Sequence, residues 1–437
     1  MRKAICLFSS AGLGELGIKN NNIDIVISNE LLEDRHRLYS VNYPNTKTFT
    51  GDIWDKKEGI VNYYKSNFSD DELFLIYATP PCQGMSSNGA GKLLSEVRKG
   101  NRKPIDERNR LIIPTMEIIR ALKPKWIILE NVENMKNTII DDENGNYVNI
   151  MDYIKDGLGD EYVGRGEVIN CADYGIPQTR KRLITIYTRD EKGKEYFYEH
   201  ETFFPDSEKT HKNKWITLRE AIGHLPPLQA KKGQESRLDI SPYYYVPILN
   251  EEKYWWVSNT KEGDTAFNNQ CVNKECLYDG NKLHGSNTRN GRHESNKDTP
   301  IYCAKCGHLL PRPTIIDKKT GERRLIKGYD SAYRRMEWNK PAGTITQKFQ
   351  FESSDKKLHP EQNRVLSIYE ALILQTINEY PYVFEIDGKV ISRGMFAKII
   401  GESVPPKLID IICRKIIQID NKTYRTKKLS EKQLSLF

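Results

Sequence analysis

Short apolar runs, each bounded by polar residues, alternate with amphipathic stretches between Lys3 and Tyr187. The stretches near Arg35–Val41 and Arg108–Leu122 have helical patterning. Strands that alternate with helices predict a mostly parallel sheet covered on both faces. Because such sheets bind ligands at the carboxyl ends of their strands, the residues that follow each strand are candidate site residues. The predicted strands are Lys3–Phe8, Ile23–Ile27, Leu73–Ala78, Trp126–Leu129 and Leu183–Tyr187.

The character of the sequence changes after the last of these strands. Between residues 196 and 345, Pro, Tyr, Trp, Asn and Gly become frequent and helical periodicity nearly disappears. Ser367–Thr376 and Met395–Ile417 regain helical patterning. We therefore predict four parts: an α/β domain at 1–195, a loop-rich domain at 196–345, a segment at 346–420 that packs back on the first domain, and a flexible tail at 421–437.

The composition says more about the cellular compartment of the protein than about its function. The chain has 437 residues, and 67 Lys and Arg against 59 Asp and Glu give a formal charge of +8. This mild excess suits a phosphate-bearing partner and equally an ordinary, slightly basic enzyme. The sequence has no secretory signal and no run near the roughly 18 apolar residues of a membrane span. Because the cysteines are only eight, we expect a cytoplasmic protein with reduced thiols and no membrane contact.

A turn rich in small residues follows the first predicted strand, in the sequence LFSSAGLGELG. These residues let the backbone pass close to a ligand before a helix begins. Two acids follow the next strands: Glu30 can accept hydrogen bonds from ribose hydroxyls, and Asp52 could meet an adenine amino group. Each feature alone is weak evidence, because solvated loops have the same composition. Together they favour a nucleotide-like cofactor beside Ser9, Ser10, Ala11, Gly12 and Gly14.

The sequence ATPPCQGMS, from Ala78 to Ser86, follows another apolar strand. Two prolines stiffen the chain, and Cys82 then lies at the carboxyl end of the strand. A lone cysteine is usually a small buried apolar residue. Cys82 instead lies where the chain leaves a strand and enters a polar loop, which is the setting of a reactive thiolate.

A carboxylic acid and two arginines follow later strands. Trp126–Leu129 runs directly into Glu130, whose pKa would be raised if it were desolvated at the mouth of the sheet, as suits a proton donor. Farther along, YGIPQTRKR contains Arg180 and Arg182, spaced to point the same way from an extended segment. A guanidinium group suits a phosphate or the carbonyl oxygen of a base.

These blocks, in this order, resemble the cytosine-5 DNA methyltransferase family. The matching series is FSxAG, E, D, PPCQ, ENV, QxRxR and a late GxxVPP, over most of residues 1–190 and 340–415. The resemblance implies a Rossmann-like, S-adenosylmethionine-dependent methyltransferase in which the inserted 196–345 domain recognises a target in double-stranded DNA. Further matches are Asp106, Arg108 and Leu111 in a DxRxxL block, Arg364, Glu370 and Gln375 in a late helix, and Gly401–Val404 in a final block.

The resemblance also implies a role for each matched residue. Cys82 is expected to be the nucleophile, Glu130 to contact the target cytosine, and Arg182 to reach the cytosine O2. Arg180 is expected to support this site, and Asn131 to brace the Cys82 loop. The expected S-adenosylmethionine contacts are Phe8, on which adenine would stack, and Ser9, Ala11, Gly12, Gly14, Glu30, Asp52, Ile53, Pro80, Ser403 and Val404.

Three departures from the family pattern accompany these matches. Ser10 and Leu13 replace glycines, Met85 replaces a phenylalanine, and Glu402 replaces an asparagine. The first and the last lie on the cofactor side, so we expect them to affect cofactor affinity. None of them touches the nucleophile or the acid.

Four cysteines of the loop-rich domain form two close pairs, Cys271-x4-Cys276 and Cys303-x2-Cys306. Four thiolates suit tetrahedral Zn²⁺, and short turns can present both sulfurs of a pair. In a reducing compartment we predict a structural zinc site rather than disulfides, because a domain with little periodic core gains stability from a metal. The alternative ligands His284, His293 and His308 are expected at the surface.

Two basic stretches are candidates for a DNA-facing surface, with a solvated charged surface as the alternative for each. Lys92–Arg110 holds seven basic and three acidic residues, and Lys305–Arg335 holds nine and three. The chain ends in Gln433-Leu434-Ser435-Leu436-Phe437. This end resembles the short peptide by which bacterial proteins bind the replication sliding clamp, although an inert tail has the same composition.

Two other functions remain open. An RNA cytosine-5 methyltransferase would share the architecture, although the large recognition domain favours DNA. A non-catalytic, sequence-specific DNA-binding protein could keep the scaffold, but the intact set of Cys82, Glu130 and Arg182 argues against it. We expect a monomer that either acts alone or has a cognate restriction endonuclease as its functional partner.

Overall fold

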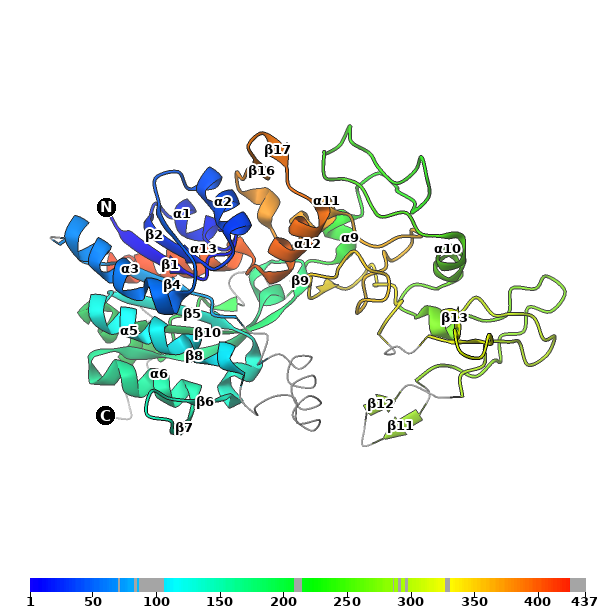
Figure 1. Ribbon diagram of the computed structural model, residues 1–437, viewed down its shortest axis with the longest axis horizontal. Coiled ribbons are helices and arrows are strands. Elements are labelled where there is room, and N and C mark those ends of the chain that lie inside the picture. The colour runs from blue at the N-terminus through cyan, green and yellow to red at the C-terminus, as the bar shows by residue number, and fades with distance from the viewer. Residues whose placement is uncertain are drawn as a thin grey trace, which may run out of the picture.

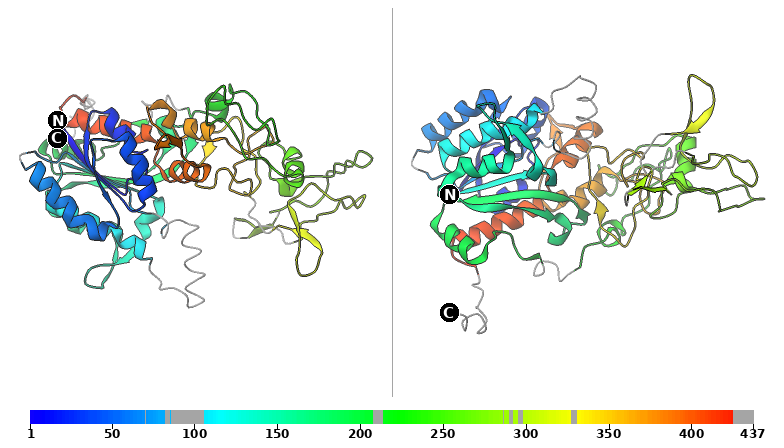
Figure 2. Two further views of the ribbon diagram at one scale, coloured as in Figure 1. Left: turned by 45° about the horizontal axis from the view of Figure 1, so that its top comes forward. Right: turned by 90° about the horizontal axis from the view of Figure 1, so that it is seen from below.

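The computed structural model describes residues 1–69, 71–81, 85, 106–207, 214–285, 287–289, 292–294, 298–326 and 331–424. An α/β part with the long sheet lies at one end of an elongated molecule, and a loop-rich part lies at the other (Figures 1 and 2). The helices α9 (Leu218–Ile222), α11 (Ile368–Leu374) and α12 (Arg393–Glu402) lie between them. Within the described residues, no helix is long and apolar enough to cross a membrane.

A seven-stranded sheet forms the centre of the α/β part, in the order β3-β2-β1-β4-β5-β10-β8. Neighbouring strands from β3 to β5 are parallel, whereas β10 is antiparallel to both β5 and β8. The strand order reverses between β1 and β4, and α/β sheets bind ligands at such a point. In sheet order the strands are β3 (Lys47–Thr50), β2 (Asp24–Glu30), β1 (Lys3–Leu7), β4 (Leu75–Ala78), β5 (Trp126–Asn131), β10 (Lys181–Thr188) and β8 (Val163–Asn170). The five predicted strands are confirmed.

Helices cover both faces of this sheet, as alternation of side chains along β1 shows. Ala4 and Cys6 pack in one hydrophobic core, and Ile5 and Leu7 pack in the other. The first core includes residues of α1 (Leu16–Asn20), α2 (Glu33–Asn42), α7 (Glu191–His200) and α13 (Pro406–Asp420). The second includes residues of α3 (Ile53–Asn67), α5 (Ile112–Leu122) and α6 (Ile150–Leu158).

The helical patterning of Met395–Ile417 is confirmed, and it corresponds to two helices that return to the first core. The helix α12 ends at Glu402 and α13 begins at Pro406. Proline lacks the backbone N–H that a continuous helix needs, and the chain is extended at Ser403 and Pro405. The helix α13 then packs tightly on α1, since a Cβ atom at Gly17 would lie 2.4 Å from the Pro406 carbonyl oxygen.

Shorter elements complete the described chain. The predicted helix at Arg108–Leu122 begins as the 3-10 helix η1 (Glu107–Leu111) before α5. Other 3-10 helices are η2 (Glu133–Asn137), η3 (Gly159–Glu161), η4 (Cys171–Tyr174), η5 (Ala266–Asn268) and η6 (Ile377–Glu379). Short strands pair as β6 (Ile139–Asp141) with β7 (Tyr147–Asn149), β9 (Gln178–Thr179) with β15 (Ala342–Gly343), and β16 (Glu385–Ile386) with β17 (Lys389–Val390).

The loop-rich part contains α10 (Glu251–Ser258) and two hairpins, β11 (Asn287–Arg289) with β12 (Arg292–Glu294) and β13 (Thr314–Ile316) with β14 (Arg323–Leu325). Buried arginines tie its loops together. Arg335 donates hydrogen bonds to the carbonyl oxygens of Val257, Thr260, His359 and Gln362, and Arg312 to those of Asn269, Lys282 and Pro300. Both were counted in the basic stretch Lys305–Arg335, so two of its charges are structural and do not face DNA.

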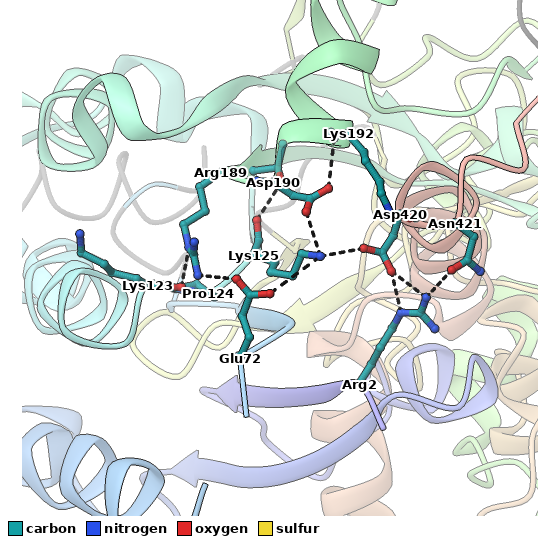
Figure 3. Close-up of polar contacts among 12 residues, drawn as sticks. Arg2, Glu72, Lys123, Pro124, Lys125, Arg189, Asp190, Lys192, Asp420 and Asn421 are labelled. Carbon is teal, nitrogen blue, oxygen red and sulfur yellow. Dashed lines mark hydrogen bonds and ion pairs between the residues drawn. The ribbon is translucent and has the colours of Figure 1, made fainter. Parts of the chain in front are cut away.

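A cluster of ion pairs fixes the end of α13 at the edge of the sheet opposite the candidate site (Figure 3). Lys125, which precedes β5, lies 2.8 Å from Asp190 and 2.9 Å from Asp420. Arg2 also reaches Asp420, at 2.7 Å. A second pair joins Arg189 to Glu72 at 2.7 Å. The two ends of the described chain are therefore joined beside the start of β5.

Candidate active site

The turn after β1 holds unusual backbone geometry at the point where the strand order reverses. Phe8 and Ser10 have φ angles of 62° and 48°, and residues other than glycine rarely adopt such values. Gly12 has a φ angle of 77°, and a Cβ atom there would lie 2.5 Å from the Tyr43 ring. Such strain gathers at functional sites, where the surrounding structure holds the backbone in place.

The carboxylate of Glu30, at the end of β2, holds this turn. It accepts hydrogen bonds from the backbone N–H groups of Ser10 (2.8 Å) and Leu32 (2.9 Å). Beside it, Leu31 and Leu32 are 61% and 43% exposed, which is unusual for leucine and leaves an apolar surface for a ligand. The buried hydroxyl of Ser10 has no hydrogen-bond partner among the residues that the structure describes. An acid, apolar side chains and an unpartnered hydroxyl together fit an adenosine-bearing cofactor.

The other predicted cofactor residues lie at the same edge of the sheet or near it. Asp52 precedes α3 and caps it, accepting a hydrogen bond from Trp54 N, while Ile53 is buried. Ser403 and Val404 lie in the extended link between α12 and α13, and Val404 is buried. Ser9 is buried as well, and its hydroxyl donates to the Cys6 carbonyl oxygen. The structure thus brings together Glu30 and the turn after β1, whereas Asp52 is engaged in helix capping.

The predicted nucleophile Cys82 lies outside the described residues, but both flanks of its short segment are described. Asn131 Nδ2 donates to the carbonyl oxygen of Pro80 at 3.0 Å. Asn134 Nδ2 donates to that of Met85 at 2.9 Å. The bracing role of Asn131 was expected from the resemblance, whereas that of Asn134 was not. The second amide side chain in ENVEN was the available signal for it. The segment after β5 therefore holds the segment after β4 on both sides.

Glu130 and Arg182 form a close ion pair at the carboxyl end of β5. The Nε atom of Arg182 lies 2.9 Å from Oε1 of Glu130, and the two side chains are 13% and 10% exposed. Burial raises the pKa of Glu130, although the charges of Arg182 and Arg180 oppose this shift. A carboxyl group that is buried yet reachable, and whose pKa is raised, can hold or share a proton with a bound base.

Arg180 differs from Arg182 in its surroundings. It is 1% exposed, and its guanidinium group donates to the carbonyl oxygens of Ile345 (2.9 Å), Gly401 and Glu402 (both 3.3 Å). Arg180 lies between β9 and β10, and its charge, like that of Arg182, acts on Glu130. Arg180 therefore joins the β9–β10 segment to the final block and is a positioning residue.

The late matched residues form a buried polar network rather than a ligand site. Arg364 and Glu370 are both 0% exposed and make two hydrogen bonds of 2.7 Å. Gln375 accepts a hydrogen bond from Gln178 and donates to the Ile400 carbonyl oxygen. In the earlier DxRxxL block, Asp106 caps η1 and pairs with Arg108 at 2.5 Å. Of these residues, Gln375 links the β9 segment to the end of α12.

The four cysteines of the loop-rich part come together in one cluster. Their Sγ atoms all lie within 4.8 Å of one another, with Cys271 and Cys306 at 3.6 Å and Cys276 and Cys303 at 3.9 Å. These separations exceed the roughly 2.05 Å of a disulfide. They match the ~3.8 Å between sulfurs that tetrahedral Zn–S bonds of about 2.3 Å require. The expectation that His284 lies at the surface was wrong, because its side chain is buried against Thr299. His308 is exposed, as expected, and contacts Asn273.

Comparison with known sequences agrees with this arrangement. Residues 3–418 match the C-5 cytosine-specific DNA methylase family. The type II methyltransferase M1.HgaI of Avibacterium volantium is 30% identical, over 94% of this chain and 97% of its own length. The type II methyltransferase M.DdeI of Desulfomicrobium norvegicum is 24% identical, over 94% of this chain and 88% of its own.

Solved structures share the fold. A DNA modification methyltransferase encoded within an E. coli prophage superposes with a TM-score of 0.53 at 17% identity, over 96% of this chain and 100% of its own. A variant of Spodoptera frugiperda DNMT2 gives 0.51 at 13% identity, over 95% and 100%. Fold and comparisons thus define an α/β methyltransferase. The chain belongs to the C-5 cytosine-specific DNA methylase family, and it is a DNA (cytosine-5-)-methyltransferase.

Proposed function

We propose that this enzyme methylates C5 of a flipped-out cytosine in one specific double-stranded DNA sequence, with Cys82 as the nucleophile. The observation that supports this most is the Glu130–Arg182 pair, 2.9 Å apart, beside the segment that leads from Pro80 to Met85. A base inside a duplex is inaccessible to these side chains. It must therefore leave the stack, at a cost of roughly a few kcal/mol.

The residues divide the chemistry as follows. The Cys82 thiolate adds to C6 of the cytosine, and the ring becomes an enamine whose C5 is nucleophilic. Glu130 holds a proton or a hydrogen bond at N3, where charge develops, and Arg182 holds the O2 oxygen. Once C5 has taken up the methyl group that bound S-adenosylmethionine would supply, loss of the C5 proton to water returns the electron pair to the ring and expels the Cys82 thiolate. Arg180 takes no part in these steps but holds the final block in place.

The turn after β1 is the proposed S-adenosylmethionine site. Glu30 would hold the ribose, Phe8 and Leu31 would contact the adenine, and the backbone from Ser9 to Gly14 would lie along the amino-acid end. Asp52, Ile53, Pro80, Ser403 and Val404 complete the proposed lining. When bound there, S-adenosylmethionine supplies an electrophilic methyl group. The exposed Leu31 and the unpartnered Ser10 hydroxyl support this assignment.

The cysteine cluster is a proposed structural zinc site in the target-recognition domain. Cys271, Cys276, Cys303 and Cys306 would hold the ion as four thiolates, with no position left open for a substrate. Among the described residues, the apolar cluster around them contains one other buried residue, Leu310. A metal would therefore supply much of the stability of this part.

The partners and the compartment of the enzyme are part of the same proposal. The sequence relatives of this chain are type II methyltransferases. This favours a cytoplasmic, monomeric enzyme of a restriction-modification system, with a cognate endonuclease as its functional partner. The basic stretch Lys92–Arg110 is a second proposed DNA contact, and most of it lies outside the described residues. Gln433–Phe437, also outside them, is proposed to bind a sliding clamp; a pull-down unaffected by its deletion would exclude this.

The test is to express wild type and Cys82→Ala in a host that lacks cytosine methylation, and to sequence the genomic DNA after bisulfite conversion. We expect protected cytosines in one recurring motif with wild type and none with the variant. Complete conversion with folded wild-type protein would contradict the proposal and favour an RNA substrate or a non-catalytic scaffold. Assay on RNA would then separate these alternatives.

A further inference from the structure

A partly buried ion pair spans two segments that are far apart in the chain. Arg35, in the first turn of α2, meets Glu402, the last residue of α12. Arg35 Nη1 lies 2.5 Å from Oε2 of Glu402, and Nη2 lies 3.1 Å from Oε1. The side chains are only 14% and 24% exposed. Two parallel contacts between a guanidinium and a carboxylate give the pair a fixed geometry.

Several other contacts hold Glu402 in place. Gln347 Nε2 donates to its Oε1 atom at 2.5 Å, and Arg180 Nη2 donates to its backbone carbonyl oxygen at 3.3 Å. The preceding Gly401 packs so closely that a Cβ atom there would lie 2.1 Å from Gln347 N. Glu402 therefore presents its carboxylate to Arg35 from a rigid support.

Arg35 in turn belongs to the segment that follows the strained turn. Glu30, five positions earlier, holds Ser10 N, and it also holds Leu32 N just before α2. Any displacement of the start of α2 would pass to Leu31, Leu32 and the Glu30 carboxylate. On the opposite side, Glu402 is followed directly by Ser403 and Val404. The ion pair thus links the two segments between which the proposed cofactor site lies.

The charge of Arg35 is needed at this place. Burial raises the pKa of Glu402, and the nearby Glu30 raises it further, while Arg35 lowers it. Without Arg35, two carboxylates would face each other at the edge of the site, and either repulsion or proton uptake would shift them. With Arg35 present, the Arg35–Glu402 pair is neutral overall, and its role is to fix the position of α2 relative to the end of α12.

We propose that Arg35 and Glu402 form a positioning pair that sets the affinity of this enzyme for S-adenosylmethionine, by holding the start of α2 against the final block. This inference rests on the proposed cofactor site. Neither residue is assigned a contact with the reacting atoms. The effect belongs to cofactor binding and not to the attack of Cys82 on cytosine.

The experiment is a double-mutant cycle with Arg35→Met, Glu402→Gln and both together. Binding of S-adenosylmethionine and of S-adenosylhomocysteine is measured by calorimetry without DNA, beside the melting temperature. We expect each single change to weaken binding by about tenfold, and the double variant to be no weaker than the poorer single one. Arg35→Lys, which keeps the charge, should recover much of the affinity.

Arg37→Met is the matched control, because Arg37 lies on the same helix and pairs with Asp387 at 2.5 Å, where both side chains are exposed. It should change affinity by less than about twofold, as exposed pairs contribute little. Additive effects in the cycle, or a loss no larger than in Arg37→Met, would overturn the inference. So would a lower melting temperature with unchanged affinity. If wild type bound neither ligand, the proposed cofactor site itself would be wrong, and this inference with it.

Discussion

Two arginines separated by one residue show how much of a site depends on contacts that no local pattern reveals. Arg182 forms an ion pair with Glu130, whereas Arg180 is buried against carbonyl oxygens of residues 345, 401 and 402. The residue types in QTRKR predicted cations at the site. They could not predict that the guanidinium group of Arg180 would donate hydrogen bonds to backbone carbonyl groups more than 160 positions away in the sequence. The positions of Glu130 and Glu30 at the edge of the sheet were predictable because each lies at the end of an apolar strand.

Asn134 is the residue whose role a substitution tests most simply. Asn134→Asp keeps the size of the side chain but replaces the N–H donor to the Met85 carbonyl oxygen with a second acceptor. We expect kcat to fall by about 10- to 100-fold, since misplacement of a nucleophile by ~1 Å is costly, with S-adenosylhomocysteine affinity unchanged. Asn67→Asp, which alters a similar but exposed contact to Tyr63, is the control. Equal rates in the two variants would remove Asn134 from the site.

Glu15 gives the fold a dependence on pH. Burial raises its pKa from 4.5 to about 8, and its side chain is 3% exposed beneath the turn after β1. The folded state therefore keeps a proton that the unfolded chain releases above pH 4.5. The stability is fully present below that pH and falls as the pH rises toward 8, by roughly 4 kcal/mol.

Glu15→Gln should abolish most of this loss. We expect the variant to be more stable than wild type at pH 8, with little difference at pH 5, in urea titrations at both values. Glu58→Gln, at an exposed position of α3, should leave the difference between the two pH values unchanged. A wild type equally stable at pH 5 and pH 8 would exclude this account of Glu15.

At the scale of elements, the strands were easier to predict than the helices that end the chain. Buried strands are short apolar runs, so their pattern is visible without knowledge of their neighbours. The break between α12 and α13 was signalled by Pro405 and Pro406, yet apolar periodicity on both sides concealed it. The antiparallel setting of β10 and β8 has no local signature, because it depends on how the chain returns to the sheet.

The cysteine cluster is the element that metal removal tests. We expect one zinc ion per chain in the purified protein by elemental mass spectrometry. Cys303→Ser or a strong chelator should remove it and weaken sequence-specific DNA binding by at least about a hundredfold. Binding of S-adenosylhomocysteine should stay within about twofold. Cys413→Ala, in the core beside the sheet, should keep the metal. If the protein without zinc bound DNA as tightly as the wild type, a structural role of the metal would be contradicted.

At the scale of the whole molecule, the two ends of the chain are brought together on one sheet. Arg2 and Lys125 both reach Asp420 (Figure 3), and α13 packs against α1. The elongated loop-rich part is joined to this body through α9, α11 and α12 (Figure 1). The alternation of strand and helix patterns predicted the sheet. The loop-rich part has no such periodicity, so its structure could not be predicted in the same way. Its loops are joined by hydrogen bonds from buried arginines, and four cysteines cluster within it.

The most direct test of the central claim is covalent trapping of the nucleophile. A duplex that contains the methylated motif, with 5-fluorocytosine at the target position, is incubated with the enzyme and S-adenosylmethionine. Fluorine at C5 cannot leave as the proton does, so the thiolate cannot be expelled. We predict a DNA–protein adduct that survives denaturation, maps by mass spectrometry to Cys82, and is absent with Cys82→Ser. An active wild type that forms no adduct, or an adduct at another residue, would contradict the account.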